Sequence, residues 1–265
     1  MNEKTREKRR VVPVELEDED LLAPSESARP GLAAWLLAAP VLAVVGLLAW
    51  ARLCFGVDTP LSEELGTTAM IADFGLILLF CLPHSLLARG SGRRFLNRLA
   101  GPEAERPIYV LVSGLSLCAL VFWWQTGGPM LWNHEGALLV VARLLQASGL
   151  LLALWAALVS GGGDLLGLPQ LRALERGHSA PGRELVALPP YRWLRQPINA
   201  GILLFLAGSP EGTPDRLLMI VCIALWIVLS APYEERDSEI TFGSAYLDYK
   251  ERTPRWIPRS GNRNK

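Results

Sequence analysis

Charged and hydrogen-bonding side chains gather in two short segments near the C-terminal end of the sequence. The first, residues 189–197, contains two arginines, a tyrosine and a glutamine, and the second, residues 233–237, contains the adjacent carboxylates Glu234 and Glu235. Hydrogen bonds to ionised groups are roughly twice as strong as those between neutral groups, so carboxylates beside arginines suit the binding of a polar ligand. The same pattern is also typical of a solvated charged rim, and the pattern alone leaves both interpretations open.

Three polar side chains interrupt long apolar stretches, where a polar group is costly and needs a partner. His84 is either a hydrogen-bonded structural group or a proton acceptor, because its ordinary pKa lies close to neutral pH. Asp73 lies five residues beyond Thr68, where one apolar run begins, and Arg143 lies six residues beyond Ala137, where another begins. We expect these two charges to share a depth near the outer face and to form a structural ion pair.

The spacing of potential metal ligands does not indicate a metal site. None of the three histidines belongs to an HxxxH or HxxE pair. The four cysteines show no CxxC spacing and lie in or beside apolar runs, so we expect them to be small buried hydrophobic residues; they are Cys54, Cys81, Cys118 and Cys222. We therefore expect no bound metal.

Four apolar runs are long enough to cross a bilayer, whose core of about 30 Å takes roughly 20 helical residues. They are residues 32–53, 68–87, 108–125 and 137–160. Hydrophobic residues make up 51% of the chain and the formal net charge is zero, so nothing indicates a nucleic-acid partner. The expected class is an all-α polytopic membrane protein surrounded by membrane lipid.

A fifth apolar stretch, residues 198–229, is interrupted by the sequence Pro-Glu-Gly-Thr-Pro at residues 210–214. Its first part, residues 198–209, makes about 18 Å of helix and cannot cross a membrane alone, and its second part, residues 215–230, makes about 24 Å. Because basic segments flank both ends, we expect the two parts to form a helical hairpin. The two polar segments described first would then meet at one level of the membrane.

Lysine and arginine positions alternate between the two ends of the expected helices, and loops rich in these residues stay in the cytoplasm. Six precede the first apolar run, five lie in residues 89–106, five in residues 161–197 and seven after residue 235, whereas residues 55–67 and 126–136 contain none. We therefore expect both termini to be cytoplasmic. Residues 1–30 are expected to be a disordered tail, and residues 31–265 an integral membrane domain.

The two polar segments resemble motifs of a known superfamily, that of the isoprenylcysteine carboxyl methyltransferases and phospholipid methyltransferases. Residues 191–201 resemble its RHPxYxG segment, although the motif histidine is Gln196 here and the motif tyrosine is Asn199. The sequence from Glu234 onward resembles its C-terminal EE…FG..Y..Y…VPR.IP pattern, through Phe242-Gly243, Tyr246, Tyr249 and Pro254-Arg255-Trp256-Ile257-Pro258.

Upstream segments narrow the resemblance to the methanethiol S-methyltransferase branch. Residues 84–89 resemble an HSxMAR element, residues 105–110 an ERSTYVL element, residues 122–125 an FWQW element and residues 164–170 a DLFGLRQ element. The likeness runs in order from about residue 73 to residue 258. To the four spanning helices and the C-terminal helical hairpin already expected, it adds a short cytoplasmic amphipathic helix that carries Tyr246 and Tyr249.

The resemblance also implies a cofactor and site residues. S-adenosylmethionine would be held by residues of the two polar segments and of the short helix; these are Tyr191, Arg195, Gln196, Pro197, Asn199, Gly201, Glu234, Glu235, Tyr246 and Tyr249. His84 and Arg89 would be the catalytic candidates, with His84 as the base for a thiol. The glycine at position 201 would allow a ligand or a backbone to approach closely.

The function implied by the resemblance is methyl transfer to a small thiol or a lipophilic acceptor. Gln196 and Asn199 depart from the family motif, which favours one alternative, a non-enzymatic membrane protein that kept the fold. A second alternative is a haem- or reductase-related accessory membrane protein, although the sequence lacks the paired membrane histidines that a haem would use.

Overall fold

The computed structural model describes residues 28–56, 65–179, 182 and 184–257, and helices account for most of them. The tail expected over residues 1–30 falls outside the described residues, except for Ala28, Arg29 and Pro30. Pro30 is already the first residue of a helix, where its missing N–H costs nothing.

Five helical segments are long and apolar enough to cross a membrane, and they confirm the four runs expected from the sequence and the second arm of the hairpin. They are α1 and α2 taken together (Pro30–Leu36 and Ala38–Phe55), α3 (Thr67–Ala88), α5 (Pro102–Trp123), α6 (Gly136–Val159) and α10 (Pro214–Phe242). A shorter apolar helix, α9 (Pro197–Ala207), is the first arm of the hairpin.

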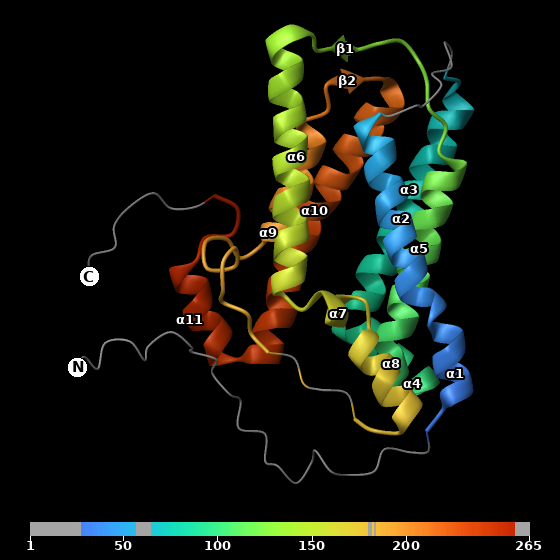
Figure 1. The fold of residues 1–265 in the computed structure, drawn as a ribbon, viewed down its shortest axis with the longest axis vertical. Coiled ribbons are helices and arrows are strands. Elements are labelled where there is room, and N and C mark those ends of the chain that lie inside the picture. The colour runs from blue at the N-terminus through green and yellow to red at the C-terminus, as the bar shows by residue number, and fades with distance from the viewer. Residues whose placement is uncertain (1–27, 57–64, 180–181, 183, 258–265) are drawn as a thin grey trace, which may run out of the picture.

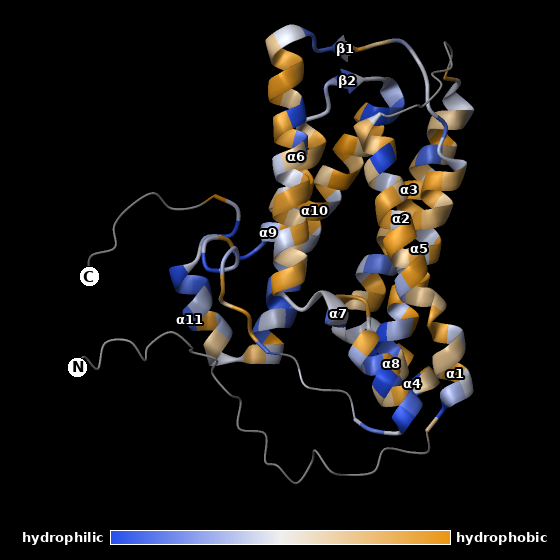
Figure 2. Cartoon of the chain, in the orientation of Figure 1, coloured by the Kyte–Doolittle hydropathy of each residue, from blue (hydrophilic) through white to orange (hydrophobic). Residues whose placement is uncertain are grey.

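Short elements complete the fold at the two ends of the bundle. The predicted amphipathic helix is α11 (Ser244–Arg252), whereas α4 (Gly90–Ala100), α7 (Gly162–Leu165) and α8 (Leu168–Arg176) were not predicted. At the opposite end, β1 (Trp132–Asn133) pairs antiparallel with β2 (Glu211–Gly212), which lies at the tip of the hairpin (Figure 1). Hydrophilic residues concentrate on α4, α8 and α11, whereas the long helices are mainly hydrophobic (Figure 2).

The last long helix extends twelve residues beyond its predicted end at residue 230. The apolar run ends at residue 230, but α10 continues through Pro232 to Phe242. The helix is 29 residues long, which corresponds to about 43 Å. Glutamate and arginine are good helix formers, and Ala231 and Glu235 are buried in this extension. Glu234 and Glu235 are therefore held on a helix rather than in a loop after it.

In the bundle, α5 packs against α2 and α3, α6 packs against α9, and α10 packs against both α3 and α9 (Figure 1). A common apolar core joins them through buried side chains from four helices: Ile77, Cys81, Leu120, Phe205, Met219, Ile223 and Ile227. The indole N–H of Trp226 on α10 also donates to the Ser85 hydroxyl on α3 at 2.7 Å.

Glycines allow α6 and α9 to pack backbone against backbone. A Cβ atom at Gly201 would lie 2.6 Å from both the Ala153 nitrogen and the Gly149 carbonyl oxygen. Small residues are the usual means of close helix packing in membranes. The close approach expected at Gly201 is therefore confirmed, and its partner is helix α6.

The expected ion pair between Asp73 and Arg143 is wrong. Arg143 donates instead to the Phe55 carbonyl at 2.7 Å and to the Gln146 side-chain oxygen at 2.9 Å. Asp73 is fully buried and accepts a bond from the Gln125 backbone N–H at 3.1 Å. The equal depth expected for Asp73 and Arg143 does not bring them together, because each side chain hydrogen-bonds to a backbone group near the end of another helix.

Candidate functional site: two polar segments joined by a buried glutamate

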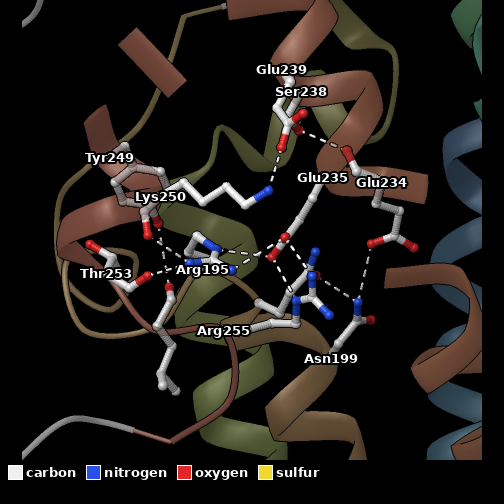
Figure 3. Close-up of polar contacts among 12 residues, drawn as sticks. Arg195, Asn199, Glu234, Glu235, Ser238, Glu239, Tyr249, Lys250, Thr253 and Arg255 are labelled. Atoms are coloured by element: carbon white, nitrogen blue, oxygen red, sulfur yellow. Dashed lines mark hydrogen bonds and ion pairs between the residues drawn. The ribbon is translucent and has the colours of Figure 1, made fainter. Parts of the chain in front are cut away.

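Main-chain hydrogen bonds bring the start of α9 and the segment after α11 side by side. The Arg195 nitrogen donates to the Pro254 oxygen at 2.9 Å, and the Gln196 nitrogen donates to the Arg255 oxygen at 3.3 Å. Pro197 follows as the first residue of α9 and is buried. The site is therefore built from three parts of the chain, which are the entry to α9, the end of α10 and the C-terminal segment (Figure 3).

Glu235 lies at the centre of this site and binds two arginines. Arg195 donates from Nε to Oε1 at 2.9 Å and from Nη2 to Oε2 at 3.2 Å. Arg255 donates from Nε to Oε1 at 2.9 Å and from Nη2 to Oε2 at 2.7 Å. The Glu235 side chain is only 2% exposed, so this is a buried pair in which the hydrogen bonds must compensate for lost solvation.

Arg195 also fixes the C-terminal segment. Its Nη1 atom donates to the Thr253 oxygen at 2.6 Å and to the Lys250 oxygen at 2.9 Å. All three nitrogens of this guanidinium therefore have partners inside the protein, and its side chain is 10% exposed. Four of its five N–H groups are used in these bonds, so we conclude that the main role of Arg195 is to hold the site together.

Helix α11 covers one side of the Arg195–Glu235 pair with two tyrosines. Burial, assisted by the negative charge of Glu235, raises the pKa of Tyr246 to about 12. Burial also raises the pKa of Tyr249, whose hydroxyl donates to the Tyr191 carbonyl at 2.7 Å. Both phenols are therefore neutral near pH 7 and serve as packing and hydrogen-bonding groups.

A second polar group, formed by Gln196, Asn199 and Glu234, lies beside the pair (Figure 3). The Asn199 amide nitrogen donates to Gln196 Oε1 at 2.8 Å and to Glu234 Oε2 at 3.3 Å. The Ser230 hydroxyl donates to the other Glu234 oxygen at 3.0 Å. Glu234 is exposed, in contrast to its neighbour Glu235. The two residues that depart from the family motif, Gln196 and Asn199, are thus hydrogen-bonded to each other.

The structure places His84 away from these residues, between α3 and α5. Its Nδ1 atom lies 3.1 Å from the Tyr109 hydroxyl and 3.2 Å from the Ser113 hydroxyl, and the Phe80 ring stacks on it. Arg89 directly follows the last residue of α3, and its guanidinium lies 4.4 Å from the ring centre of Tyr233 on α10. The interface between α3 and α10, here called the α3–α10 seam, therefore separates His84 from the group formed by Gln196, Asn199 and Glu234.

The side chains at the end of α10 provide the charges that an amino-acid part of a cofactor would need. Glu234 can accept hydrogen bonds from an ammonium or from hydroxyl groups, and the amides of Gln196 and Asn199 can donate and accept. Arg255, 31% exposed, can donate to an anion. This set fits S-adenosylmethionine by its chemistry. Among the described residues there is no group of three or more His, Cys, Asp or Glu that could hold a metal ion.

Arg255 is the residue of this site that the sequence analysis did not identify. It stands in the Pro254-Arg255-Trp256 part of the C-terminal motif, but a motif does not reveal that the Arg255 guanidinium returns to Glu235, which is 20 residues earlier. Lys250 and Thr253 contribute through their carbonyl oxygens, and no side-chain pattern could have indicated this role.

Comparison with known proteins gives relatives over most of the chain. "Methanethiol S-methyltransferase 2" of Bradyrhizobium diazoefficiens is 31% identical over 191 residues, which cover 72% of this chain and 74% of that protein. "Methanethiol S-methyltransferase" of Mycobacterium tuberculosis is 28% identical and covers 76% of this chain and 83% of its own. "Nurim" of Xenopus laevis is 31% identical over 59% of this chain and 58% of its own. No protein-family model and no solved structure matches.

These relatives and the spanning helices define a class of integral multi-pass membrane proteins related to methyltransferases. Within this class, the chain belongs to the methanethiol S-methyltransferase family of the isoprenylcysteine methyltransferase-like superfamily. The resemblance read from the motifs is confirmed.

Proposed function

We propose that this protein is a membrane methyltransferase that uses S-adenosylmethionine and acts on a small thiol or a lipophilic acceptor. The observation that carries the proposal is the group formed by Gln196, Asn199 and Glu234 beside the Arg255–Glu235 pair, at the positions of the family motifs. Its open carboxylate, amides and cation suit the amino-acid and ribose parts of this cofactor.

The cofactor supplies an electrophilic methyl group, whose bond to the sulfonium sulfur breaks as the acceptor sulfur forms a new bond to carbon. The chain's own task is to hold the acceptor in line with that group, and such positioning supplies much of the rate increase in reactions of this kind. A thiol must also lose its proton, and we assign His84 as the acceptor of that proton. Hydrogen bonds to Tyr109 and Ser113 orient its ring.

Arg89 would hold Tyr233 at the α3–α10 seam, beside the face of α10 that carries Glu234. Trp226 and Ser85 connect the same two helices nearer the core. In this proposal the acceptor approaches along the seam, between the His84 side and the Glu234 side.

The site faces the cytoplasm in this proposal, with both termini on that side. Helices α4, α8 and α11 lie at the end of the bundle that carries the site (Figure 1), and they contain basic residues: Arg93, Arg94, Arg98, Arg172, Arg176, Lys250 and Arg252. Basic segments stay on the cytoplasmic side of membranes, where the cofactor would also be found.

The experiment is calorimetric titration of S-adenosylhomocysteine into the full-length protein purified in detergent. We expect saturable binding, and we expect methylated product when S-adenosylmethionine and a small thiol are supplied together. If the folded protein binds no S-adenosylhomocysteine at millimolar concentration, the non-enzymatic alternative replaces the proposal. Binding without methylation of any thiol or lipophilic acceptor would retain the cofactor and reject the acceptor class.

A further inference from the structure

A guanidinium with one unused nitrogen stands at the edge of the buried pair. Arg255 directs Nε and Nη2 to Glu235, and its Nη1 atom has no acceptor among the described residues. Its side chain is 31% exposed, whereas that of Glu235 is 2% exposed. One edge of the guanidinium is thus held rigidly inside, while the other remains available.

The cluster of Arg195, Glu235 and Arg255 carries a net charge of plus one. Two guanidiniums share the single carboxylate of Glu235, and all three Arg195 nitrogens have partners inside the protein. The negative charge of Glu235 is thus already shared with Arg195. The side of the cluster that faces outward therefore presents the unused N–H groups of Arg255, which suit an anion.

Oppositely charged groups lie on the same side of the cluster. In Figure 3 the Arg255 guanidinium lies between Glu235 and Asn199, and Asn199 in turn contacts Glu234. The backbone of Arg255 is tied to the base of α9, because its carbonyl accepts the Gln196 N–H at 3.3 Å. A cation and a solvent-exposed carboxylate held in this way match the two charges of an α-amino acid, with its carboxylate toward Arg255 and its ammonium toward Glu234.

We propose that Arg255 binds the carboxylate of the amino-acid part of S-adenosylmethionine, while Glu235 fixes the orientation of its guanidinium. This inference rests on the proposed function, since it names the subsite that one end of the cofactor occupies. Arginine suits the role because its planar fork can donate two parallel hydrogen bonds to a carboxylate.

The test compares two ligands that differ only in the carboxylate. One is S-adenosylhomocysteine, and the other is its decarboxylated analogue, which keeps the adenosine, the thioether and the ammonium. A hydrogen bond to a charged group is worth about 1.5–3 kcal/mol, so wild-type protein should prefer S-adenosylhomocysteine by about 10- to 150-fold in calorimetric titrations. Arg255→Gln should lose most of this preference and should bind the analogue within about threefold of wild type.

The matched control is Arg252→Gln, since Arg252 is exposed at the end of α11, three residues before Arg255. It should keep the full preference. Arg255→Lys keeps the charge and should retain part of the preference, and it serves if the glutamine variant does not fold. Thermal melts without ligand establish whether each variant is folded.

The outcomes separate this inference from the proposed function. If wild type binds both ligands equally, the carboxylate has no site and the inference is wrong, while cofactor binding stands. If Arg255→Gln weakens both ligands to the same extent, Arg255 is only structural and the inference is again wrong. If wild type binds neither ligand, the proposed function fails first.

Discussion

Arg195 and Glu235 are separated by 40 residues in the sequence and form a two-point ion pair, with N–O distances of 2.9 Å and 3.2 Å. The pair joins the entry of α9 to the extension of α10, and Arg195 then reaches the carbonyls of Lys250 and Thr253. One guanidinium thus connects three separate parts of the chain. The pair should therefore matter to folding more than to direct ligand contact.

The first prediction concerns stability and the Glu235 carboxylate. Removing one partner of a buried ion pair leaves an uncompensated charge and costs about 3–5 kcal/mol. We expect Glu235→Ala to lower the unfolding free energy by about this amount, measured by denaturant titration in detergent. Glu239→Ala is the control, because its pair with Lys250 is 30–39% exposed, and surface pairs contribute about 0–1 kcal/mol. Equal effects of the two variants would contradict the structural role of Glu235.

The second prediction concerns cofactor affinity and the exposed neighbour, Glu234. Its contacts to Ser230 and Asn199 lie at the open edge of the site, so its loss should leave the melting temperature almost unchanged. We expect Glu234→Ala to weaken S-adenosylhomocysteine binding by about 10- to 150-fold, since a charged hydrogen bond is lost. Undiminished affinity in this variant would remove Glu234 from the cofactor site.

The third prediction separates helix packing from ligand binding at Gly201. An added Cβ atom would meet the α6 backbone at 2.6 Å, and overpacking typically costs about 1–3 kcal/mol. We expect Gly201→Ala to lower the melting temperature. Gly75→Ala on α3 should not do so, because no atom lies within 4 Å of its added Cβ. A Gly201→Ala protein that melts like wild type but has lost cofactor binding would show that a ligand, rather than α6, is the critical neighbour.

The fourth prediction follows from the separate partners of Asp73 and Arg143. Asp73→Asn keeps the acceptor for the Gln125 N–H, whereas Arg143→Gln breaks bonds to the Phe55 carbonyl and to Gln146. We expect the second variant to be clearly less stable than the first. The double variant should match the sum of the single effects within about 0.5 kcal/mol, as for sites that share no partner. A larger deviation in denaturant titrations would restore a direct interaction.

The fifth prediction concerns the orientation in the membrane. In a background in which the four native cysteines are replaced by alanine, single cysteines are introduced at the exposed positions Ser91, Ser244 and Asn133. An impermeant thiol reagent applied to whole cells should label the Asn133 variant, and the other two only after the membrane is opened. Labelling of the Ser91 or Ser244 variant in intact cells would reverse the proposed orientation.

Run length predicted the spanning helices because it follows directly from the thickness of the apolar core of a bilayer. The end of α10 was misplaced, since a hydropathy pattern cannot distinguish a polar helix extension from a loop. Packing decides that question, and Glu235 is buried only when Arg195 and Arg255 arrive from elsewhere in the chain. The predicted ion pair between Asp73 and Arg143 was wrong for a related reason, because depth along a helix gives no information on which face the side chain occupies.

The motif positions identified most of the site, although not the tasks of its members. Arg195 and Glu235 both belong to motifs that suggested ligand contact, yet their contacts lie within the protein. Arg255 was visible in the tail motif without an assigned task. Assigning these roles requires knowledge of which hydrogen-bond donors and acceptors are already paired within the protein. That pairing can be seen only in the folded structure, where the three segments lie together.

The hydrogen bond between Asn199 and Gln196 also has a consequence for how this sequence can change over time. Because the amide of one side chain donates to the amide oxygen of the other at 2.8 Å, replacing either alone leaves its partner without that bond. The two positions therefore form an epistatic unit, in which a return to the family's histidine and tyrosine is easiest when both codons change together. Among related genes, these two sites should be inherited as a pair rather than vary independently.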